Sequence, residues 1–391
     1  MQHFACLRQP ERGRGEAMVE RDDRPVAAIF RSPLFNASET FVQTHAVSLR
    51  RYRPLVVGLE DNGNCWPELR ERLLVASGGE AAALKFLGMP GGLARRVAAE
   101  RPRLVHAHFA TDGLLALPLA EALGVPLVTT LHGFDVTRSR GAMLASGRLS
   151  WVRYALRGER LRRRASLFIA VSDAIRARAL AQGFPPERTI THLNGVDLAR
   201  FARPAAPEPG LVLHVGRLVE KKGTALLLEA MAQVEGTLVV IGDGPLRPAI
   251  ERQAAALGLG PRVRFLGNLP PDEVAQWMAR AWLLAAPSIT APDGDSEGLP
   301  TVIAEAAAAS LPAVVSDHSG LPEAVIEGET GFIVPEGDAP ALARALKDAL
   351  AFPEVRARMG AAARRLAEER FDAAKQAAGL EALYDRVTGC A

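Results

Sequence analysis

Two carboxylates eight residues apart, Glu297 and Glu305, stand in the segment DGDSEGLPTVIAEAAAAS, which covers residues 293–310. Glu297 lies in a polar stretch that contains glycine, whereas Glu305 is surrounded by alanines. Residues 281–343 contain ten Asp and Glu and no Lys or Arg. The partners of these two carboxylates must therefore come from another part of the chain or from a ligand.

The same segment predicts a buried strand at 282–288, then a loop, then a helix with Pro300 at its first position. The backbone N–H groups of Gly298 and Leu299 would lie at the helix start, where anions bind. An unpaired carboxylate at Glu305 would carry a desolvation cost of several kcal/mol. Ribose hydroxyls would satisfy it, and Glu297 would meet a second hydroxylated group near the phosphates.

Two further loops in the second half carry cations and glycines after strands. Gly216, Arg217 and Lys222 follow the run LVLHV, and Gly242 and Gly244 follow the run TLVVI. Cations and free N–H groups before a helix suit a phosphate or diphosphate, and glycine permits close backbone approach. Both loops would border one cleft.

Simpler interpretations of these residues stay open. The cations could be solvated on an ordinary loop, and Gly-Asp-Gly at 242–244 could be a tight turn. Glu305 could pair with Arg217 or Lys222 across the cleft, and Glu297 could be exposed to water.

The first half offers two candidate loops at strand ends. LHGFDVT (131–137) places His132 and Asp135 where a cleft would form, and SPLFNASETF (32–41) carries Ser38, Glu39 and Thr40 at the start of a helix. A histidine at a strand end is usually structural, but the His-Gly-x-Asp arrangement at a carboxyl-end loop is a better candidate for a site.

Short apolar runs alternate with longer amphipathic segments throughout, which is typical of α/β folds with parallel sheets. We expect about six strands in each half, at 26–30, 54–59, 104–109, 126–132, 167–172 and 189–194, then at 210–216, 236–242, 263–267, 282–288, 312–317 and 331–335. The proline-containing segment 194–210 is the expected linker. Two such domains would face each other across a cleft at their carboxyl ends.

The length of 391 residues fits two domains, residues 25–200 and 201–370, with a C-terminal helix at 371–391 that crosses back to the first domain. Residues 1–24 have positive charges without an apolar core and are expected to be a disordered leader. Three widely spaced cysteines and the lack of a long apolar run favour a cytoplasmic protein.

Charge is divided unevenly between the halves. Residues 1–200 hold 29 Lys and Arg against 19 Asp and Glu, whereas residues 201–391 hold 18 against 25. The basic half suggests peripheral contact with an anionic membrane or an acidic lipid-linked substrate, although the arginines of VRYALRGERLRRRASL could simply solvate a helix. No nucleic-acid motif accompanies them, so nucleic acid is not an expected partner.

Taken together, these motifs resemble the retaining glycosyltransferases of family 4, which have the two-domain GT-B fold of facing Rossmann-like domains. The resemblance covers about residues 26–385. It rests on Glu297-x7-Glu305 with Gly298-Leu299-Pro300, Gly216-Arg217 to Lys222-Gly223, Gly242-Asp243-Gly244-Pro245, His132-Gly133-x-Asp135 and Asn194-Gly195-Val196-Asp197. Ser-Glu-Thr-Phe at 38–41 is similar to the bacterial enzymes of exopolysaccharide and colanic-acid-type synthesis.

The resemblance implies a role for each motif. Arg217 and Lys222 would neutralise the donor diphosphate, Glu305 would bind ribose, and Glu297 would contact the transferred sugar with His132 across the cleft. The catalytic group would thus comprise His132, Glu297, Arg217 and Lys222. The remaining implied positions are the donor-binding Gly216, Gly242, Gly244, Gly298, Leu299, Pro300 and Glu305, and the acceptor-side Ser38, Glu39, Thr40 and Asp135.

The activity implied is transfer of a sugar from a nucleoside-diphosphate sugar to a hydroxyl of a glycan or lipid-linked oligosaccharide, with retention. No metal or other cofactor is expected, although Asp293-Gly294-Asp295 resembles the Asp-x-Asp metal motif of the other large glycosyltransferase fold. Two alternatives stay open. One is a sugar-nucleotide epimerase on the same fold, and the other is a non-catalytic partner that binds a nucleotide sugar.

Overall fold

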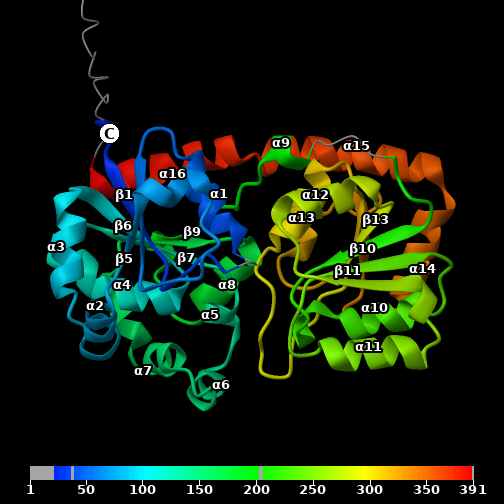
Figure 1. The fold of residues 1–391 in the computed structure, drawn as a ribbon, viewed down its shortest axis with the longest axis horizontal. Helices are drawn as coiled ribbons and strands as arrows, with labels where there is room; N and C mark the ends of the chain where they lie inside the picture. The colour runs from blue at the N-terminus through cyan, green and yellow to red at the C-terminus, as the bar shows by residue number, and fades with distance from the viewer. Residues whose placement is uncertain (1–21, 37–38, 202–205, 390–391) are drawn as a thin grey trace, which may run out of the picture.

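The computed structural model describes residues 22–36, 39–201 and 206–389. The expected leader lies almost wholly outside these residues, and so does Ser38. Figure 1 shows two lobes side by side, with the C-terminal helices running along both of them.

The N-terminal lobe is built on a seven-stranded parallel sheet in the order β5-β3-β1-β6-β7-β8-β9. All six strands predicted for this half are present, and they are buried because helices cover both faces. The seventh, β5, is a short edge strand that the sequence did not reveal. The strands are β1 (Val26–Phe30), β3 (Arg53–Gly58), β5 (Leu73–Val75), β6 (Pro102–His108), β7 (Leu127–Leu131), β8 (Leu167–Ala170) and β9 (Thr189–Thr191), with a separate short pair, β2 (Pro33–Leu34) and β4 (Glu60–Asp61).

Helices follow the strands of this lobe and bring the loops between them to the carboxyl edge of the sheet. The most deeply buried is α4, which packs between the sheet and α7. The helices are α1 (Thr40–Ser48), α2 (Gly78–Ala82), α3 (Gly91–Ala99), α4 (Ala110–Leu123), α5 (Phe134–Thr137), α6 (Arg140–Ala145), α7 (Leu149–Arg164) and α8 (Asp173–Ala181), with short helical turns at Pro67–Arg72, Ala83–Leu87 and Pro186–Arg188.

The C-terminal lobe has a six-stranded parallel sheet in the order β12-β11-β10-β13-β14-β15, and its strands are the six predicted ones. They are β10 (Leu211–Val215), β11 (Thr237–Ile241), β12 (Val263–Gly267), β13 (Leu283–Ala286), β14 (Ala313–Ser316) and β15 (Gly331–Val334). The helices are α10 (Thr224–Met231), α11 (Arg247–Ala256), α12 (Pro271–Arg280), α13 (Thr301–Ala308) and α14 (Ala339–Ala351), with helical turns at Glu220–Lys222, Gly260–Arg262 and Leu321–Ala324. The predicted α/β class is confirmed.

Two segments pass side by side from one lobe to the other. The first contains Val196 and leads into α9 (Leu198–Phe201), and the second joins α15 (Pro353–Arg370) to α16 (Ala373–Thr388) at Phe371. The Val196 amide donates to the Phe371 carbonyl at 2.7 Å, and the Ala373 amide donates to the Val196 carbonyl at 3.0 Å. The two crossings are therefore tied to each other.

Helix α16 lies on the N-terminal lobe although it ends the chain (Figure 1). The buried Glu381 carboxylate accepts from the amides of Arg50, Arg51 and Tyr52 at 2.7, 2.6 and 3.1 Å. These charge-assisted bonds fix the helix against the turn that precedes β3. None of the helices within the described ranges is both long and apolar enough to cross a membrane.

Candidate donor cleft

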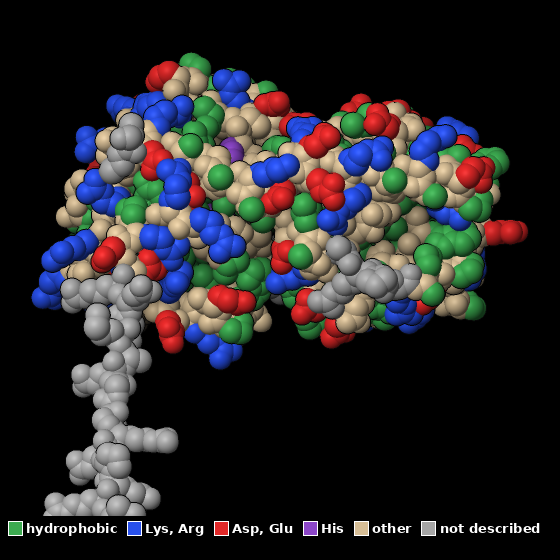
Figure 2. All heavy atoms as spheres, turned by 90° about the horizontal axis from the view of Figure 1, so that it is seen from above, with side chains coloured by type: hydrophobic (Ala, Val, Ile, Leu, Met, Phe, Trp, Pro, Cys, Tyr) green, Lys and Arg blue, Asp and Glu red, His purple; other side chains and the backbone are tan. Residues whose placement is uncertain are grey.

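The carboxyl ends of both sheets border one cleft of about 1220 Å³. Figure 2, which views the molecule from the side of α15 and α16, shows the two lobes with an indentation between them. The volume exceeds that of a typical small-molecule pocket, so the cleft has room for two substrates at once. Sequence-predicted residues from both lobes line it, namely Glu39, Thr40, His132, Gly216, Arg217, Lys222, Gly242, Glu297, Gly298, Leu299, Pro300 and Glu305.

The cationic loop after β10 lies on the C-terminal side of the cleft. Arg217 is exposed there, and no ion pair joins it to another described residue. Lys222 instead places its Nζ 3.2 Å from Oε1 of Glu297, and its side chain runs along Gly216, where a Cβ would come within 3.1 Å of it. The loop therefore presents one exposed guanidinium beside one paired ammonium.

Gly242 and Gly244 pack the loop after β11 directly against the loop after β10. A Cβ on Gly242 would lie 2.0 Å from the Gly216 carbonyl oxygen, and a Cβ on Gly244 would lie 2.3 Å from that of Leu218. Gly242 also has a φ of +132°. These two glycines are required by backbone approach, and Gly244 itself does not line the cleft.

Glu297 is buried, with 6% of its surface exposed, so the prediction that water alone could solvate it is wrong. Burial by itself would raise the pKa of this carboxyl, but the Lys221 and Lys222 ammonium groups outweigh it and hold the pKa below its ordinary value. The Glu297 carboxylate is therefore ionised at neutral pH. Its Oε1 receives no well-aligned hydrogen bond from the described residues, although both ammonium groups are near it.

Glu305 is in the opposite electrostatic situation. It lies on α13 at the cleft, and burial raises the pKa of its carboxyl to about 7, opposed by a hydrogen bond from Thr301 and the charge of Arg200. The alternative in which Glu305 pairs with Arg217 or Lys222 is wrong, because Lys222 pairs with Glu297 and no ion pair of the described residues involves Glu305.

The N-terminal lobe meets the Glu297 loop through backbone contact. A Cβ on Gly298 would lie 2.0 Å from the carbonyl oxygen of His132, and Gly133, with a φ of +145°, would bring a Cβ to 3.1 Å from the Ser296 carbonyl. The imidazole of His132 packs between the rings of Phe41 and Phe109, at centroid distances of 4.4 and 4.5 Å. His132 and Glu297 are thus brought to the same part of the cleft.

Asp135 is placed differently from the prediction that it serves the acceptor side. Its carboxylate is fully buried and accepts from the amides of Ala110, Gly133 and His132 at 2.9, 2.9 and 3.2 Å. These backbone bonds occupy the carboxylate, and Asp135 does not line the cleft. It shapes the loop that carries His132.

The acceptor-side loop after β1 contains an ion-pair network that sequence reasoning missed. The Arg31 guanidinium binds Glu39 at 2.8 Å and Asp112 at 2.6 Å, and all three line the cleft. Thr40 lies beside Glu39 at the start of α1. Asp112 is distant in sequence from Arg31 and lies in the apolar helix α4. A single acidic residue in such a helix could have indicated a buried ion pair.

The Asp293-Gly294-Asp295 segment is held by cations from both lobes. Arg138 of the N-terminal lobe binds Asp293 at 2.6 Å and Asp295 at 2.9 Å, and Lys221 binds Asp295 at 3.1 Å. These ion pairs therefore join the two lobes at the rim of the cleft. Sequence reasoning missed Arg138, whose partners are more than 150 residues away.

Comparison with solved structures defines the class of protein first. HepE of Anabaena, solved in complex with UDP and glucose, matches with a TM-score of 0.76 at 22% identity, over 93% of this chain and 100% of that chain. Sucrose-phosphate synthase of Thermosynechococcus elongatus matches with a TM-score of 0.76 at 21% identity, over 94% and 100%. The predicted GT-B fold is confirmed.

Sequence comparison then gives the family. The model of glycosyl transferases group 1 matches residues 196–366, and that of glycosyltransferase family 4 matches residues 42–200. The chain is 33% identical over 299 residues to a GDP-mannose-dependent phosphatidylinositol monomannoside mannosyltransferase of Mycolicibacterium smegmatis, covering 68% of this chain and 74% of the relative. The protein belongs to the family 4 glycosyltransferases.

Other relatives agree with the predicted exopolysaccharide subgroup. The chain is 35% identical over 253 residues to the putative colanic acid biosynthesis glycosyltransferase WcaL of Salmonella typhimurium, and 33% identical over 249 residues to the amylovoran biosynthesis glycosyltransferase AmsK of Erwinia amylovora. The matches cover 62% and 61% of this chain, and the chain spans about 60% and 59% of those relatives' lengths.

The close approach of Gly298 to the His132 carbonyl predicts that one methyl group added at Gly298 will push the two lobes apart. Gly298→Ala should lower the melting temperature, because its Cβ would overlap the His132 carbonyl and overpacking costs about 1–3 kcal/mol. Small-angle scattering should show a larger radius of gyration. Gly79→Ala is the control, since nothing lies within 4 Å of its Cβ. Equal melting and equal dimensions for Gly298→Ala and wild type would contradict the prediction.

Proposed function

We propose that this protein transfers a hexose-type sugar from a nucleoside-diphosphate sugar to a hydroxyl of a glycan or lipid-linked oligosaccharide in polysaccharide synthesis, with retention of anomeric configuration. The observation that carries the proposal is that an exposed Arg217, which has no ion pair among the described residues, lines the same cleft as two carboxylates with different pKa values, Glu297 and Glu305. The subgroup of its relatives supports the polysaccharide context.

In this mechanism the positive charge of Arg217 and Lys222 stabilises the diphosphate as it leaves. Preorganised charge aimed at the site where negative charge develops is usually the largest catalytic contribution. The backbone N–H groups near Leu299 and Thr301, at the start of α13, add hydrogen-bond donors for the phosphates. The proposal requires no metal, because these groups supply the charge.

The two carboxylates divide the rest of the donor. Glu305 binds the ribose hydroxyls, since its raised pKa and lack of an ion pair leave it in need of neutral donors. Glu297, ionised and held by Lys222, contacts hydroxyls of the transferred sugar through its incompletely bonded Oε1. The acceptor enters from the side of Glu39 and Thr40 and attacks from the face that the diphosphate leaves.

The first experiment is a thermal-shift screen with UDP-, GDP-, ADP- and dTDP-sugars, because a bound donor raises the melting temperature by mass action. Transfer is then measured with the selected donor and a glycan acceptor. Arg217→Ala and Glu305→Ala should each lower kcat/KM by about 100-fold, since each removes a charged contact of 2–3 kcal/mol.

Arg252→Ala, an exposed arginine on α11 of the same lobe, is the matched control and should transfer normally. Normal transfer by both site variants would contradict the proposal. Incubation with donor alone tests the epimerase alternative, which predicts an epimerised nucleotide sugar without acceptor. Binding without turnover would indicate a non-catalytic partner.

The role of Glu305 predicts a pH dependence of donor binding. Its pKa is raised to about 7 in the free protein, and a carboxylate that accepts from ribose must be ionised, so binding releases a proton below pH 7. Affinity for the selected nucleotide sugar should rise about tenfold from pH 6 to pH 8, in calorimetry. Glu305→Gln should bind weakly and without this slope. The same slope in both proteins would assign it to another group.

We propose further that the N-terminal lobe touches an anionic membrane through α7 and the segment 84–89. Leu149 and Leu156 of α7 are 51% and 60% exposed, and Phe86 and Leu87 are 70% and 72% exposed. Arg153 joins the two segments by donating to the Lys85 carbonyl at 2.9 Å. Exposed apolar groups among arginines suit a surface that meets acidic lipids, and the further arginines of α7 are Arg157, Arg160, Arg162, Arg163 and Arg164.

Vesicle co-sedimentation checks this surface. The protein should bind vesicles of phosphatidylcholine with phosphatidylglycerol better than pure phosphatidylcholine, and the difference should shrink at high salt. Phe86→Ser with Leu87→Ser should weaken binding, whereas Phe352→Ser, which changes an exposed apolar residue of the other lobe, should not. Equal binding to neutral and anionic vesicles at low salt would contradict the proposal.

A further inference from the structure

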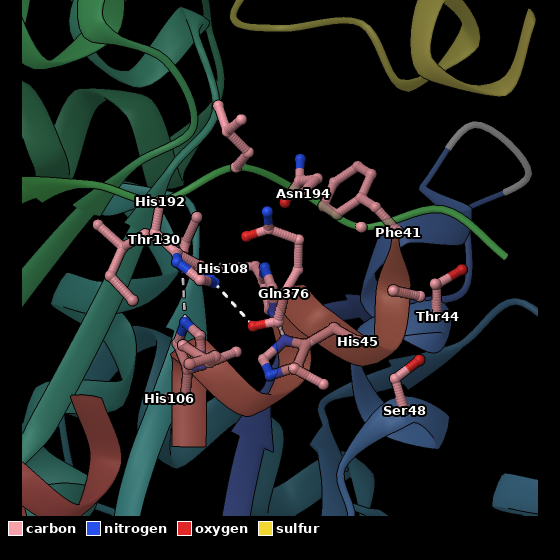
Figure 3. Close-up of a pocket in the computed structure, with 16 residues that line it drawn as sticks. Phe41, Thr44, His45, Ser48, His106, His108, Thr130, His192, Asn194 and Gln376 are labelled. Atoms are coloured by element: carbon pink, nitrogen blue, oxygen red, sulfur yellow. Dashed lines mark hydrogen bonds between the residues drawn. The ribbon is translucent and has the colours of Figure 1, made fainter. Parts of the chain in front are cut away.

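A second, smaller cavity of about 40 Å³ lies in the N-terminal lobe behind the cleft. Its walls come from α1, β6, β7, β8, the segment 192–195 and the crossing helix α16, and Figure 3 shows His45, His106 and His108 around it. His106 and His108 point to the same face of β6, because side chains two residues apart in a strand share a face. The donor mechanism uses none of these histidines.

The imidazoles form one continuous series of hydrogen bonds that reaches the cleft. His106 contacts Thr130 Oγ1 through Nε2 at 2.7 Å and the Tyr384 hydroxyl through Nδ1 at 2.6 Å. The same hydroxyl contacts Nε2 of His45 at 2.9 Å. His45 Nδ1 then contacts His108 Nε2 at 3.1 Å, and His108 Nδ1 contacts His132 Nε2 at 3.0 Å.

The histidines in this series are neutral. Burial lowers the pKa of His45 to about 3 and lowers the pKa values of His106, His108 and His132 well below the ordinary histidine value. Neighbouring imidazoles and the Arg31 guanidinium add to this effect at His108 and His132. A neutral imidazole has one N–H donor and one acceptor, so each contact fixes the role of the next nitrogen.

Thr130 sets the direction of the series. Among the described residues its hydroxyl contacts only His106 Nε2, so the Thr130 proton is bonded within the protein when Thr130 donates there. His106 Nδ1–H then donates to Tyr384, and Tyr384 donates to Nε2 of His45. His45 and His108 then each carry their proton on Nδ1 and donate it to Nε2 of the next histidine. Nε2 of His132 is therefore an acceptor.

His132 consequently carries its proton on Nδ1. No described residue bonds that nitrogen, and the side chain is partly exposed at the cleft, where it can donate to an oxygen of a bound substrate. The opposite direction would turn the same nitrogen into an acceptor. The hydroxyl of Tyr384 is the only link between the Thr130 end and the His132 end within the part of the chain that the structure describes.

We propose that Tyr384 is a positioning residue, which fixes the tautomer of His132 through His45 and His108 so that His132 donates from Nδ1 into the cleft. Helix α16 thereby acts on a residue of the cleft, although no residue of α16 lines the cleft itself. The catalytic meaning of this tautomer rests on the proposed function, but the tautomer itself is a property of the free protein.

A metal site is the competing explanation, because one ring nitrogen from each of His45, His106 and His108 lies within 4.8 Å of the others. Both nitrogens of each ring already have partners, however. A divalent cation would have to break at least two of these bonds, because His45 Nδ1 and His108 Nε2 are bonded to each other. The hydrogen-bond series accounts for both ring nitrogens of His45, His106 and His108. His192, which also lines the cavity, contacts the Gln376 carbonyl through Nε2 at 3.0 Å.

Nitrogen-15 NMR of the histidine side chains in the free protein tests the proposal. Wild type should show His132 as a single neutral tautomer protonated on Nδ1, assigned through His132→Asn. Tyr384→Phe removes the hydroxyl that joins His106 to His45, so Thr130 no longer sets the direction of donation among His45, His108 and His132. Both tautomers of His132 should then be populated. Thr130→Val removes the directing donor while it keeps Tyr384, and it should have the same effect.

Tyr52→Phe is the matched control. It removes another hydroxyl between this lobe and α16, one that donates to Asp385 at 2.9 Å, and it should leave the His132 tautomer as in wild type. Melting temperatures check that all three variants are folded. Unchanged tautomers in both Tyr384→Phe and Thr130→Val would overturn the proposal. So would a stoichiometric change of the His45, His106 and His108 signals on adding Zn²⁺ alone.

Kinetics give the second test. With the donor selected by the thermal-shift screen, Tyr384→Phe should lower kcat about three- to tenfold with little change in KM, while Tyr52→Phe should match wild type. An equal kcat for Tyr384→Phe would contradict the positioning role. If wild type transfers no sugar, the proposed function fails, and the tautomer measurement still decides whether the series is directed.

Discussion

The Glu297 carboxylate is buried against the Lys222 ammonium at 3.2 Å, and the rest of the cleft depends on this ion pair. A lone buried carboxylate would be strongly destabilising, and no cation is available within its own segment. Lys222 reaches it from the loop after β10, which Gly216 permits because its missing side chain leaves room for the lysine stem. The pair thus fixes two loops of the C-terminal lobe relative to each other before any ligand binds.

The second carboxylate, Glu305, lacks the kind of ion-pair partner that Glu297 has. Glu305 is partly buried on α13 in the same site, but it has no ion pair among the described residues, and the pKa of its carboxyl is raised to about 7. Two chemically identical groups, eight residues apart, therefore differ in pKa because Glu297 is ion-paired with Lys222, whereas Glu305 has no ion pair among the described residues. Environments that separate the pKa values of paired groups in this way are typical of functional sites.

Local sequence could predict the strands, the glycine-containing loops after β10 and β11 and the segment of the crossing helix, because each leaves a periodic or glycine-marked pattern. It could not predict β5, a three-residue edge strand beside charged residues. It also misplaced Asp135, since nothing in His-Gly-x-Asp shows that the carboxylate turns back to amides of its own loop. Arg138 and Tyr384 were missed for a related reason. Arg138 hydrogen-bonds a residue 157 positions away, and Tyr384 hydrogen-bonds residues 278 and 339 positions away, so only the fold brings these groups together.

The chain order itself explains how the N-terminal lobe can be built by residues from both ends of the sequence. Because Val196 and Phe371 are hydrogen-bonded where the chain crosses between lobes, any rotation of one lobe must bend both strands of the crossing together. Helix α16 lies beyond that point and is fixed to the N-terminal lobe by Glu381, so it belongs with His45 and His132 and not with the loop that holds Glu297. The hydrogen-bond series from Thr130 through Tyr384 to His132 consequently lies wholly within the N-terminal lobe and α16, with no residue of the other lobe in it. Under the proposed function, a rotation of the lobes would move His132 relative to Glu297 and leave the bonds that set the His132 tautomer undisturbed.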